Sequence, residues 1–162
     1  MACYNPRILM DKAGIYIHIP FCRSRCSYCD FATGTYEGEL AERYVHALTA
    51  EIAASGAHEE KIEVDTIYFG GGTPSLLTPA QITRILAAMR GRFRVADEAE
   101  ITLEMNPGTV TAEGLCELRR LGINRASFGA QTFDDWELRR LGRTHTAEDA
   151  RRTLEHLRVA GF

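Results

Sequence analysis

Long hydrophobic runs, an excess of basic residues and low-complexity segments are all missing from this 162-residue sequence. Its longest apolar runs lie near residues 14–20 and 66–69, far short of the roughly 20 residues that cross a membrane. The polar segment 1–11 lacks the hydrophobic stretch of a signal peptide. A net charge of −3 argues against a strongly basic nucleic-acid-binding surface. We therefore expect a cytoplasmic protein with no integral membrane segment and no nucleic-acid partner.

Short apolar runs alternate with helical stretches along a chain of ordinary globular composition, 45% hydrophobic and 25% charged. The runs predict strands at residues 14–19, 65–69, 100–105 and 125–130. Helical spacing, caps and glycine stops predict five helices. The first ends before Gly56 and carries Leu40, Tyr44, Val45, Leu48 and Ile52 on one face. The others run from Thr78-Pro79 through Met89, from Thr111 to Gly122, over 134–141 and over 146–160. This order predicts an α/β fold of β/α units on a parallel sheet.

The number of these units is too small for a closed barrel. Such a barrel takes about eight β/α units and about 250 residues, whereas about four are predicted here. The sequence ends at Phe162, directly after a helix, where the next parallel strand is due. We therefore expect residues 1–162 to form a partial parallel (β/α) barrel, truncated before the barrel is complete.

Three of the five cysteines fall within eight residues, at Cys22, Cys26 and Cys29. In a reducing compartment such a group indicates metal binding or catalysis rather than disulfides. Three thiolates on one loop can bind three irons of a 4Fe-4S cluster and leave the fourth iron open to another ligand. Two alternatives remain: a zinc site completed by His18 or His46, and three ordinary thiols. The two other cysteines, Cys3 and Cys116, are expected to be inert.

Sequence blocks surround the cysteines in a fixed order, at residues 15–22, 68–75, 104–109, 124–133 and 141–145. With the cysteine spacing, this series resembles the radical S-adenosylmethionine (radical SAM) superfamily, and within it the oxygen-independent coproporphyrinogen III oxidase family. The resemblance covers nearly the whole chain. It implies a radical SAM core domain, of which residues 1–162 are the N-terminal part, with a C-terminal domain absent.

One position separates two branches of that family. The pattern Cys-x3-Cys-x2-Cys-x-Cys, with a further cysteine two residues after the third, is typical of the oxidases. Here that position is Phe31, as in the heme chaperone branch, and the blocks around Asn106 and Arg143 also resemble that branch. The resemblance implies a heme chaperone that transfers heme to an acceptor protein. The alternatives are an oxygen-independent coproporphyrinogen III oxidase and a zinc-binding module without a redox role.

The resemblance also implies roles for individual residues. Cys22, Cys26 and Cys29 would hold the cluster, whose open iron takes S-adenosylmethionine, and an electron donor would be a further partner. An electron passing through such a cluster can break the sulfonium bond and give a 5′-deoxyadenosyl radical. The residues expected at S-adenosylmethionine are Tyr16, Tyr28, Gly71, Gly72, Thr73, Glu104, Gln131 and Arg143.

Plainer interpretations accompany several of these residues. The glycines can form a tight turn before the Thr78 cap, and Tyr16 and Tyr28 can be packing aromatics. Glu104 ends an apolar strand, so its carboxylate needs a partner whatever its role. Arg143 can be a surface arginine. His18 and His145 are possible heme or metal ligands, but structural histidines are the commoner case, so we assign a ligand role to neither.

Overall fold

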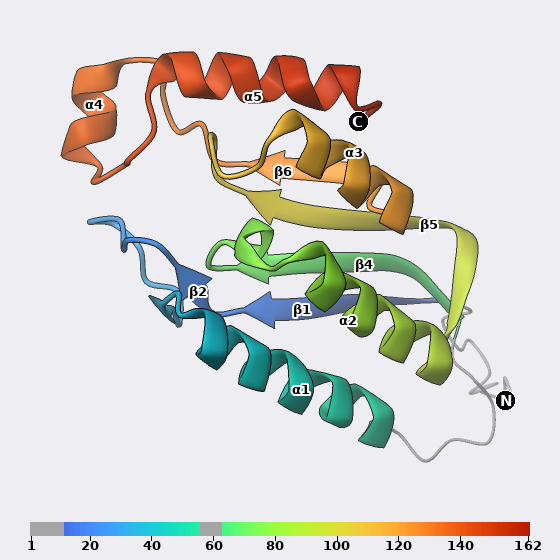
Figure 1. Ribbon diagram of the computed structural model, residues 1–162. Coiled ribbons are helices and arrows are strands. Elements are labelled where there is room, and N and C mark those ends of the chain that lie inside the picture. Colours follow the sequence, from blue (N-terminus) through green and yellow to red (C-terminus); the bar gives the residue numbers. More distant parts are fainter. Residues whose placement is uncertain (1–11, 56–62) are drawn as a thin grey trace, which may run out of the picture.

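The computed structural model describes residues 12–55 and 63–162, which form an α/β fold around a four-stranded parallel sheet (Figure 1). The strand order is β1-β4-β5-β6. These strands are β1 (Ala13–Ile19), β4 (Glu63–Gly71), β5 (Arg94–Met105) and β6 (Arg125–Phe128). All neighbours in the sheet are parallel, as the alternation of strands and helices predicts.

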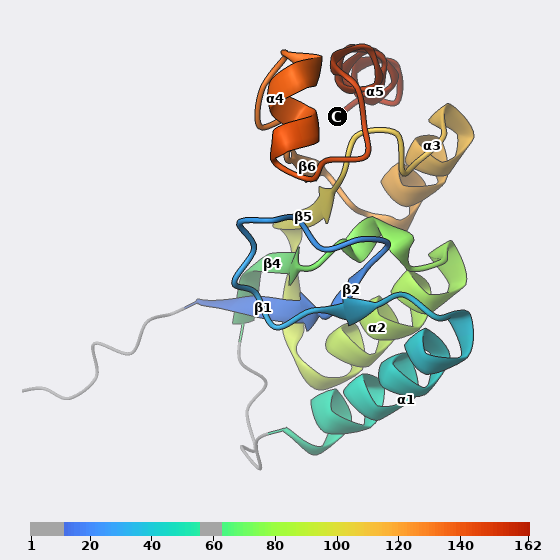
Figure 2. The ribbon, with the colours of Figure 1, turned by 90° about the vertical axis from the view of Figure 1, so that its left-hand side faces the viewer.

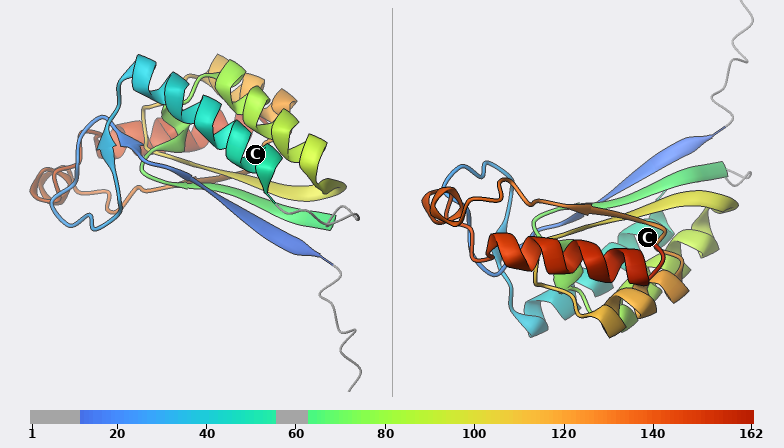
Figure 3. Two further views of the ribbon diagram at one scale, coloured as in Figure 1. Left: turned by 90° about the horizontal axis from the view of Figure 1, so that it is seen from below. Right: turned by 90° about the horizontal axis from the view of Figure 1, so that it is seen from above.

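The long helices lie along one face of the sheet, and the opposite face of the described part stays uncovered by helices (Figure 3). They are α1 (Gly38–Ala54), α2 (Pro79–Arg92), α3 (Ala112–Leu121) and α5 (Ala147–Val159). Neighbouring helices contact each other in the order α1, α2, α3, α5. No helix in the described ranges is both long and apolar enough to cross a membrane.

Shorter elements gather at the carboxyl ends of the strands. They are the two-stranded pair β2 (Phe21–Cys22) and β3 (Gly34–Thr35), the 3-10 helix η1 (Pro74–Leu76) and the helix α4 (Asp135–Arg140). The cysteine loop, residues 22–33, joins β2 to β3 beside α4 (Figure 2). Parallel β/α proteins place their functional loops at this end of the sheet.

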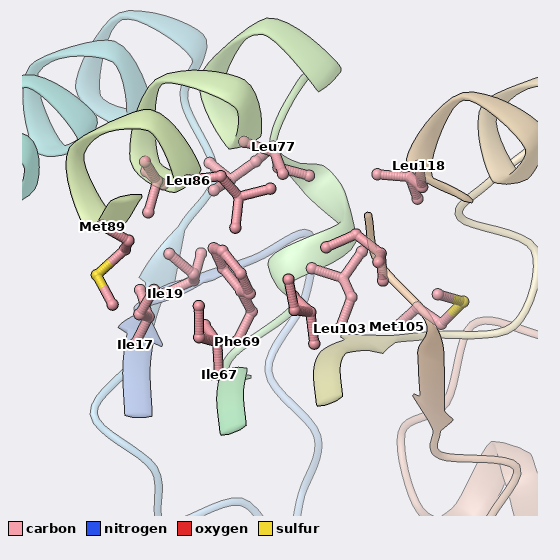
Figure 4. Close-up of a cluster of buried hydrophobic side chains, with 14 of the residues drawn as sticks. Ile17, Ile19, Ile67, Phe69, Leu77, Leu86, Met89, Leu103, Met105 and Leu118 are labelled. Carbon is pink, nitrogen blue, oxygen red and sulfur yellow. The ribbon is translucent and has the colours of Figure 1, made fainter. Parts of the chain in front are cut away.

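The hydrophobic core fills the space between the sheet and the helices (Figure 4). Because strand side chains alternate between faces, every second residue of each strand enters this core. Ile17, Phe69 and Leu103 are almost completely buried there, against helix residues such as Leu86 and Met89. The intervening strand residues therefore lie on the uncovered face.

Local signals in the sequence place the helix ends correctly. Thr78 forms a capping box at the start of α2, and Thr146 forms one at the start of α5. The Thr111 side chain accepts a hydrogen bond from the backbone of α3. Gly122 ends α3 with a φ of 104°, a conformation that favours glycine.

The strands depart from the predicted bounds. β4 is longer than residues 65–69, β5 begins well before residue 100, and β6 ends before residue 130. The elements β2, β3 and η1 were not predicted. Leu40 is 42% exposed, and Ala41 takes the buried position in its place. The proposed helix stop Gly56 and the thiol Cys3 lie outside the described residues.

Candidate functional site

The cysteine loop is closed by its own hydrogen bonds. The Cys29 amide donates to the Cys26 carbonyl at 3.2 Å, which makes a turn between these cysteines. The Arg25 side chain donates to the Cys29 carbonyl through Nε at 3.2 Å and Nη2 at 3.0 Å. At the base of the loop, the Tyr36 amide donates to the Cys22 carbonyl at 2.9 Å. The three thiols are therefore carried on one braced segment.

A second segment, the connection from α4 to α5, holds the loop from outside. The Ser27 amide donates to the Leu141 carbonyl at 3.3 Å. Gly142 lies so close that an added Cβ would be 3.3 Å from the Ser27 amide nitrogen. Arg143 follows directly, and its Nη1 lies 3.4 Å from the Cys26 sulfur. More than a hundred residues of chain thus separate two segments that build one site.

Most of the residues predicted from the sequence line a single pocket at the carboxyl end of the sheet. Nine of the eleven are there: Cys22, Cys26, Tyr28, Cys29, Gly71, Gly72, Glu104, Gln131 and Arg143. The two others lie at its margin. Thr73 is buried behind the loop and donates to the Cys22 sulfur at 3.6 Å. Tyr16 is 55% exposed on the uncovered face of the sheet, so it is not a core residue.

Glu104 has the partners that its position demands. The Tyr68 hydroxyl donates to Glu104 Oε1 at 2.6 Å, and the Gly71 amide donates to Oε2 at 3.1 Å. Partial burial raises the pKa of Tyr68, and the hydrogen bond to the Glu104 carboxylate raises it further. Tyr68 therefore stays protonated and donates. Its ring stacks near Tyr16, with centroids 6.0 Å apart, which connects Tyr16 to the site indirectly.

Arg143 is a cation of the pocket, held by protein contacts rather than free at the surface. Its Nη2 donates to Asn106 Oδ1 at 2.7 Å and to the Gly129 carbonyl at 2.8 Å. Its Nε is buried and has no partner among the described residues. The Nε–H donor therefore remains for an acceptor beyond these protein contacts. The positive charge of Arg143 also opposes the burial that raises the pKa of Tyr28.

Two glycines bring the end of β4 against its neighbours. Gly71 has a φ of 110°, and a Cβ there would lie 2.6 Å from the His18 ring. A Cβ on Gly72 would lie 2.5 Å from the Phe21 carbonyl oxygen. Both residues also line the pocket. The same two glycines can therefore form a tight turn and leave room for a ligand beside their backbone.

Gln131 lies beyond the end of β6 rather than on the predicted strand. Its φ of 63° is the one positive value at a non-glycine residue in the described ranges. Such backbone conformations cost about 1–3 kcal/mol and cluster at functional sites. The conformation brings its amide to the Gly129 side of the pocket.

The histidines do not join the thiols. His18 contacts the Tyr16 hydroxyl at 3.2 Å and the Ala32 carbonyl at 2.9 Å through its two ring nitrogens. His46 lies on α1 and lines a different hollow. His145 is buried and contacts the Ala130 carbonyl at 3.3 Å. Within the described ranges, no group of three or more His, Cys, Asp or Glu side chains converges closely enough to hold a metal ion.

The sequence prediction of site residues omitted two that the structure places in the site, Tyr68 and Asn106. Both occur in the blocks that carry the family resemblance, but neither was assigned a role. The sequence contained a signal for Tyr68. It lies directly before the apolar Phe69 of the same strand, and neighbouring strand residues face opposite sides of a sheet, so Tyr68 faces away from the core. Asn106 directly follows β5, at the end of the sheet where site residues gather.

Comparisons with known proteins identify the family and the fold to which this chain is similar. Residues 16–162 match the family model of the radical SAM superfamily. The chain is 43% identical over 149 residues to the heme chaperone HemW of Escherichia coli (strain K12), covering 91% of this chain and 39% of HemW. It is 38% identical over 153 residues to the oxygen-independent coproporphyrinogen III oxidase of Bradyrhizobium diazoefficiens, covering 93% and 34% of the two chains.

The fold also matches a solved structure. The coproporphyrinogen III oxidase HemN from Escherichia coli, a radical SAM enzyme, superimposes with a TM-score of 0.84 at 33% identity. The match covers 92% of this chain and 35% of HemN. The chain therefore spans between about a third and two-fifths of the length of these relatives. The family match extends over most of the chain, and the α/β fold is a partial radical SAM fold: the chain belongs to the radical SAM superfamily.

Proposed function

We propose that this chain is the cluster-binding part of a heme chaperone of the radical SAM superfamily. In this proposal Cys22, Cys26 and Cys29 hold a 4Fe-4S cluster, and S-adenosylmethionine binds beside it. The observation that carries the proposal is the pocket that contains all three cysteines together with one acid, Glu104, and two cations, Arg25 and Arg143.

The chemistry of the thiols suits an iron–sulfur cluster. Each of the three ligated irons takes its own thiolate, so the ligands can be spread over a loop. A single zinc ion instead needs all its ligands within about 2.3 Å of one point. Two of the sulfurs also have a hydrogen-bond donor, Thr73 at Cys22 and Arg143 at Cys26. Donors of this kind around ligand sulfurs are typical of cluster sites.

The charges in the pocket suit the amino-acid end of S-adenosylmethionine. An α-amino acid carries an ammonium and a carboxylate, and the pocket offers a carboxylate on Glu104 and a guanidinium on Arg143. When bound, the cluster supplies an electron to the ligand at its open iron. Glu104 and Arg143 bind and orient that ligand. Tyr68 and the Gly71 amide hold the Glu104 carboxylate in place. Asn106 and the Gly129 carbonyl hold the Arg143 guanidinium in place.

The choice of a heme chaperone rests on Phe31 and on the similarity to HemW. Phe31 lines the pocket and is 59% exposed. It stands at the position where the oxidase pattern has a further cysteine. Heme or another tetrapyrrole, a heme-acceptor protein and an electron donor are the proposed partners of the whole protein, and the cytoplasm its proposed location. Coproporphyrinogen III oxidation is the second candidate, because an oxidase and HemN are among the matches.

Cluster binding is tested by anaerobic reconstitution of the chain with iron and sulfide. We expect iron and sulfide analysis to give one four-iron cluster per chain. The reconstituted chain should also show the broad absorption at about 400 nm that is typical of iron–sulfur proteins. Cys22→Ala, Cys26→Ala and Cys29→Ala should each lose it. Cys116→Ala is the matched control, because that thiol lies on α3 outside the pocket. Equal loss in the control, or stoichiometric zinc in place of iron, would contradict the cluster assignment.

The chaperone and oxidase alternatives are separated with the reconstituted full-length protein. Heme titration followed at the Soret band should show binding, whereas incubation with coproporphyrinogen III, S-adenosylmethionine and a reductant should yield no protoporphyrinogen IX. Steady formation of that product would favour the oxidase and reject the chaperone assignment.

A further inference from the structure

The side chain of Asn106 joins the two residues that donate to cysteine sulfurs. Its Nδ2 lies 3.0 Å from Thr73 Oγ1, and its Oδ1 lies 2.7 Å from Arg143 Nη2. Thr73 in turn contacts the Cys22 sulfur, and Arg143 contacts the Cys26 sulfur. A continuous hydrogen-bonded path thus runs from Cys22 to Cys26 with Asn106 at its centre.

The direction of every hydrogen bond in this path is determined by chemistry. A guanidinium only donates, so the oxygen of the Asn106 amide must face Arg143. The amide nitrogen then faces Thr73 and donates to its hydroxyl oxygen. The proton of the Thr73 hydroxyl is left for the remaining neighbour, the Cys22 sulfur. The orientation of one amide therefore sets a donor toward each of two cysteines.

The path is held in place from the backbone. Asn106 begins a turn in which its carbonyl accepts from the Thr109 amide at 3.2 Å and from the Thr109 hydroxyl at 2.6 Å. Thr73 is 2% exposed, so its hydroxyl is shielded from competing water. The Gly129 carbonyl fixes Arg143 on the far side. The side chains are thus arranged before any ligand binds.

We propose that Asn106 is a positioning residue that directs Thr73 and Arg143 toward the sulfurs of Cys22 and Cys26 and thereby sets the reduction potential of the cluster. The inference rests on the proposed function, since the cysteines must carry the cluster. Reduction adds a negative charge that spreads onto the ligand sulfurs. Hydrogen bonds to these sulfurs stabilise the reduced form and raise the potential.

Aspartate is the sharpest probe, because it keeps the shape of asparagine and only accepts hydrogen bonds. In Asn106→Asp the Thr73 hydroxyl would turn to the new carboxylate, a stronger acceptor than a cluster-bound sulfur, and leave Cys22. The carboxylate would also place a negative charge near the cluster. Both changes disfavour reduction, so the potential should fall.

The experiment measures the midpoint potential of the reconstituted 162-residue chain, anaerobically and without S-adenosylmethionine, by redox titration followed by electron paramagnetic resonance. Asn106→Asp should shift the reduction equilibrium at least tenfold toward the oxidised cluster, a fall of about 59 mV for one electron. Thr73→Val should lower the potential in the same direction by a smaller amount. Thr83→Val is the matched control, because its hydroxyl pairs with the Pro79 carbonyl within α2, away from this path.

Each result has a defined meaning. An unchanged potential in Asn106→Asp or in Thr73→Val overturns the inference while leaving the proposed function intact, and so does an equal fall in Thr83→Val. Where Asn106→Asp takes up no cluster, Thr73→Val decides by the same criterion. If the unmodified chain itself binds no four-iron cluster, the proposed function fails and the inference falls with it. Iron content therefore reports on the function, and the potential reports on Asn106.

Discussion

Replacing Gly72 with alanine should destabilise the protein more than any change of one methyl group at a surface glycine. The added Cβ would lie 2.5 Å from the Phe21 carbonyl oxygen and 2.9 Å from its backbone carbon and nitrogen. These are backbone atoms, so no side-chain rotation can relieve the contact. Gly72→Ala must instead move the end of β4 away from β2.

The magnitude follows from what that movement disrupts. Forcing extra volume into a packed site costs about 1–3 kcal/mol. The Gly72 amide donates to the Ile19 carbonyl at 2.9 Å, and the Thr73 amide donates to the Phe21 carbonyl at 2.7 Å. Each such bond contributes about 0.5–1.5 kcal/mol net. We therefore expect the free energy of unfolding to fall by about 2–6 kcal/mol, a large part of the stability of a typical domain.

Urea unfolding followed by circular dichroism, under reducing anaerobic conditions, measures the change. Gly91→Ala in α2 is the matched control, because a Cβ there meets nothing within 4 Å. Alanine is the better helix former by about 0.5–1 kcal/mol, so the control should be neutral or stabilised. The reasoning is refuted if Gly72→Ala stays within about 0.5 kcal/mol of the unmodified chain, well below the expected cost of overpacking.

Three further outcomes test other parts of the structure. Tyr68→Phe removes the donor to Glu104 and should weaken S-adenosylmethionine binding to the reconstituted chain by about 1.5–3 kcal/mol, measured by calorimetric titration; unchanged affinity would exclude this role. Burial, reinforced by the positive charge of Arg143, lowers the pKa of His145. The unfolded chain then takes up a proton below pH of about 6.5 before the native protein does, so unfolding free energy should fall from there downward, and His145→Gln should flatten this slope. Thr78→Ala removes a capping box and should cost about 1 kcal/mol in urea unfolding, with no loss of cluster.

Helix ends were predictable because their signals are local. A threonine one residue before the helix supplies the cap, and a glycine after it supplies the left-handed conformation, so Thr78, Thr111, Thr146 and Gly122 identify their helices without knowledge of the rest. Strand lengths were not predictable in the same way. The first half of β5 is polar, and it forms a strand because Arg94 and Val95 pair with Glu63 and Val64 of β4.

In the site too, residues with a signal along the chain were predicted, and residues that act through distant contacts were not. The cysteines were identified from their spacing along the chain, and the resemblance supplied the glycines, Glu104 and Arg143. Tyr68 and Asn106 act through contacts with residues more than thirty positions away, which spacing does not encode. The ligand contact of Tyr16 stays a prediction from its motif position, and the structure places this residue beside Tyr68 on the uncovered face.

The dependence of the site on the sheet follows from how its parts are supplied. The cysteine loop follows β1, the glycines end β4, Glu104 ends β5, and Arg143 follows β6. Side chains alternate between faces along a strand, so a slip of β5 by one residue would turn Glu104 into the helix-packed core and expose Leu103. Burial of Leu103 opposes that slip, because exposing such a side chain costs about 1.5–3 kcal/mol. The hydrophobic core thus fixes the register, and the register places the charges around the thiols.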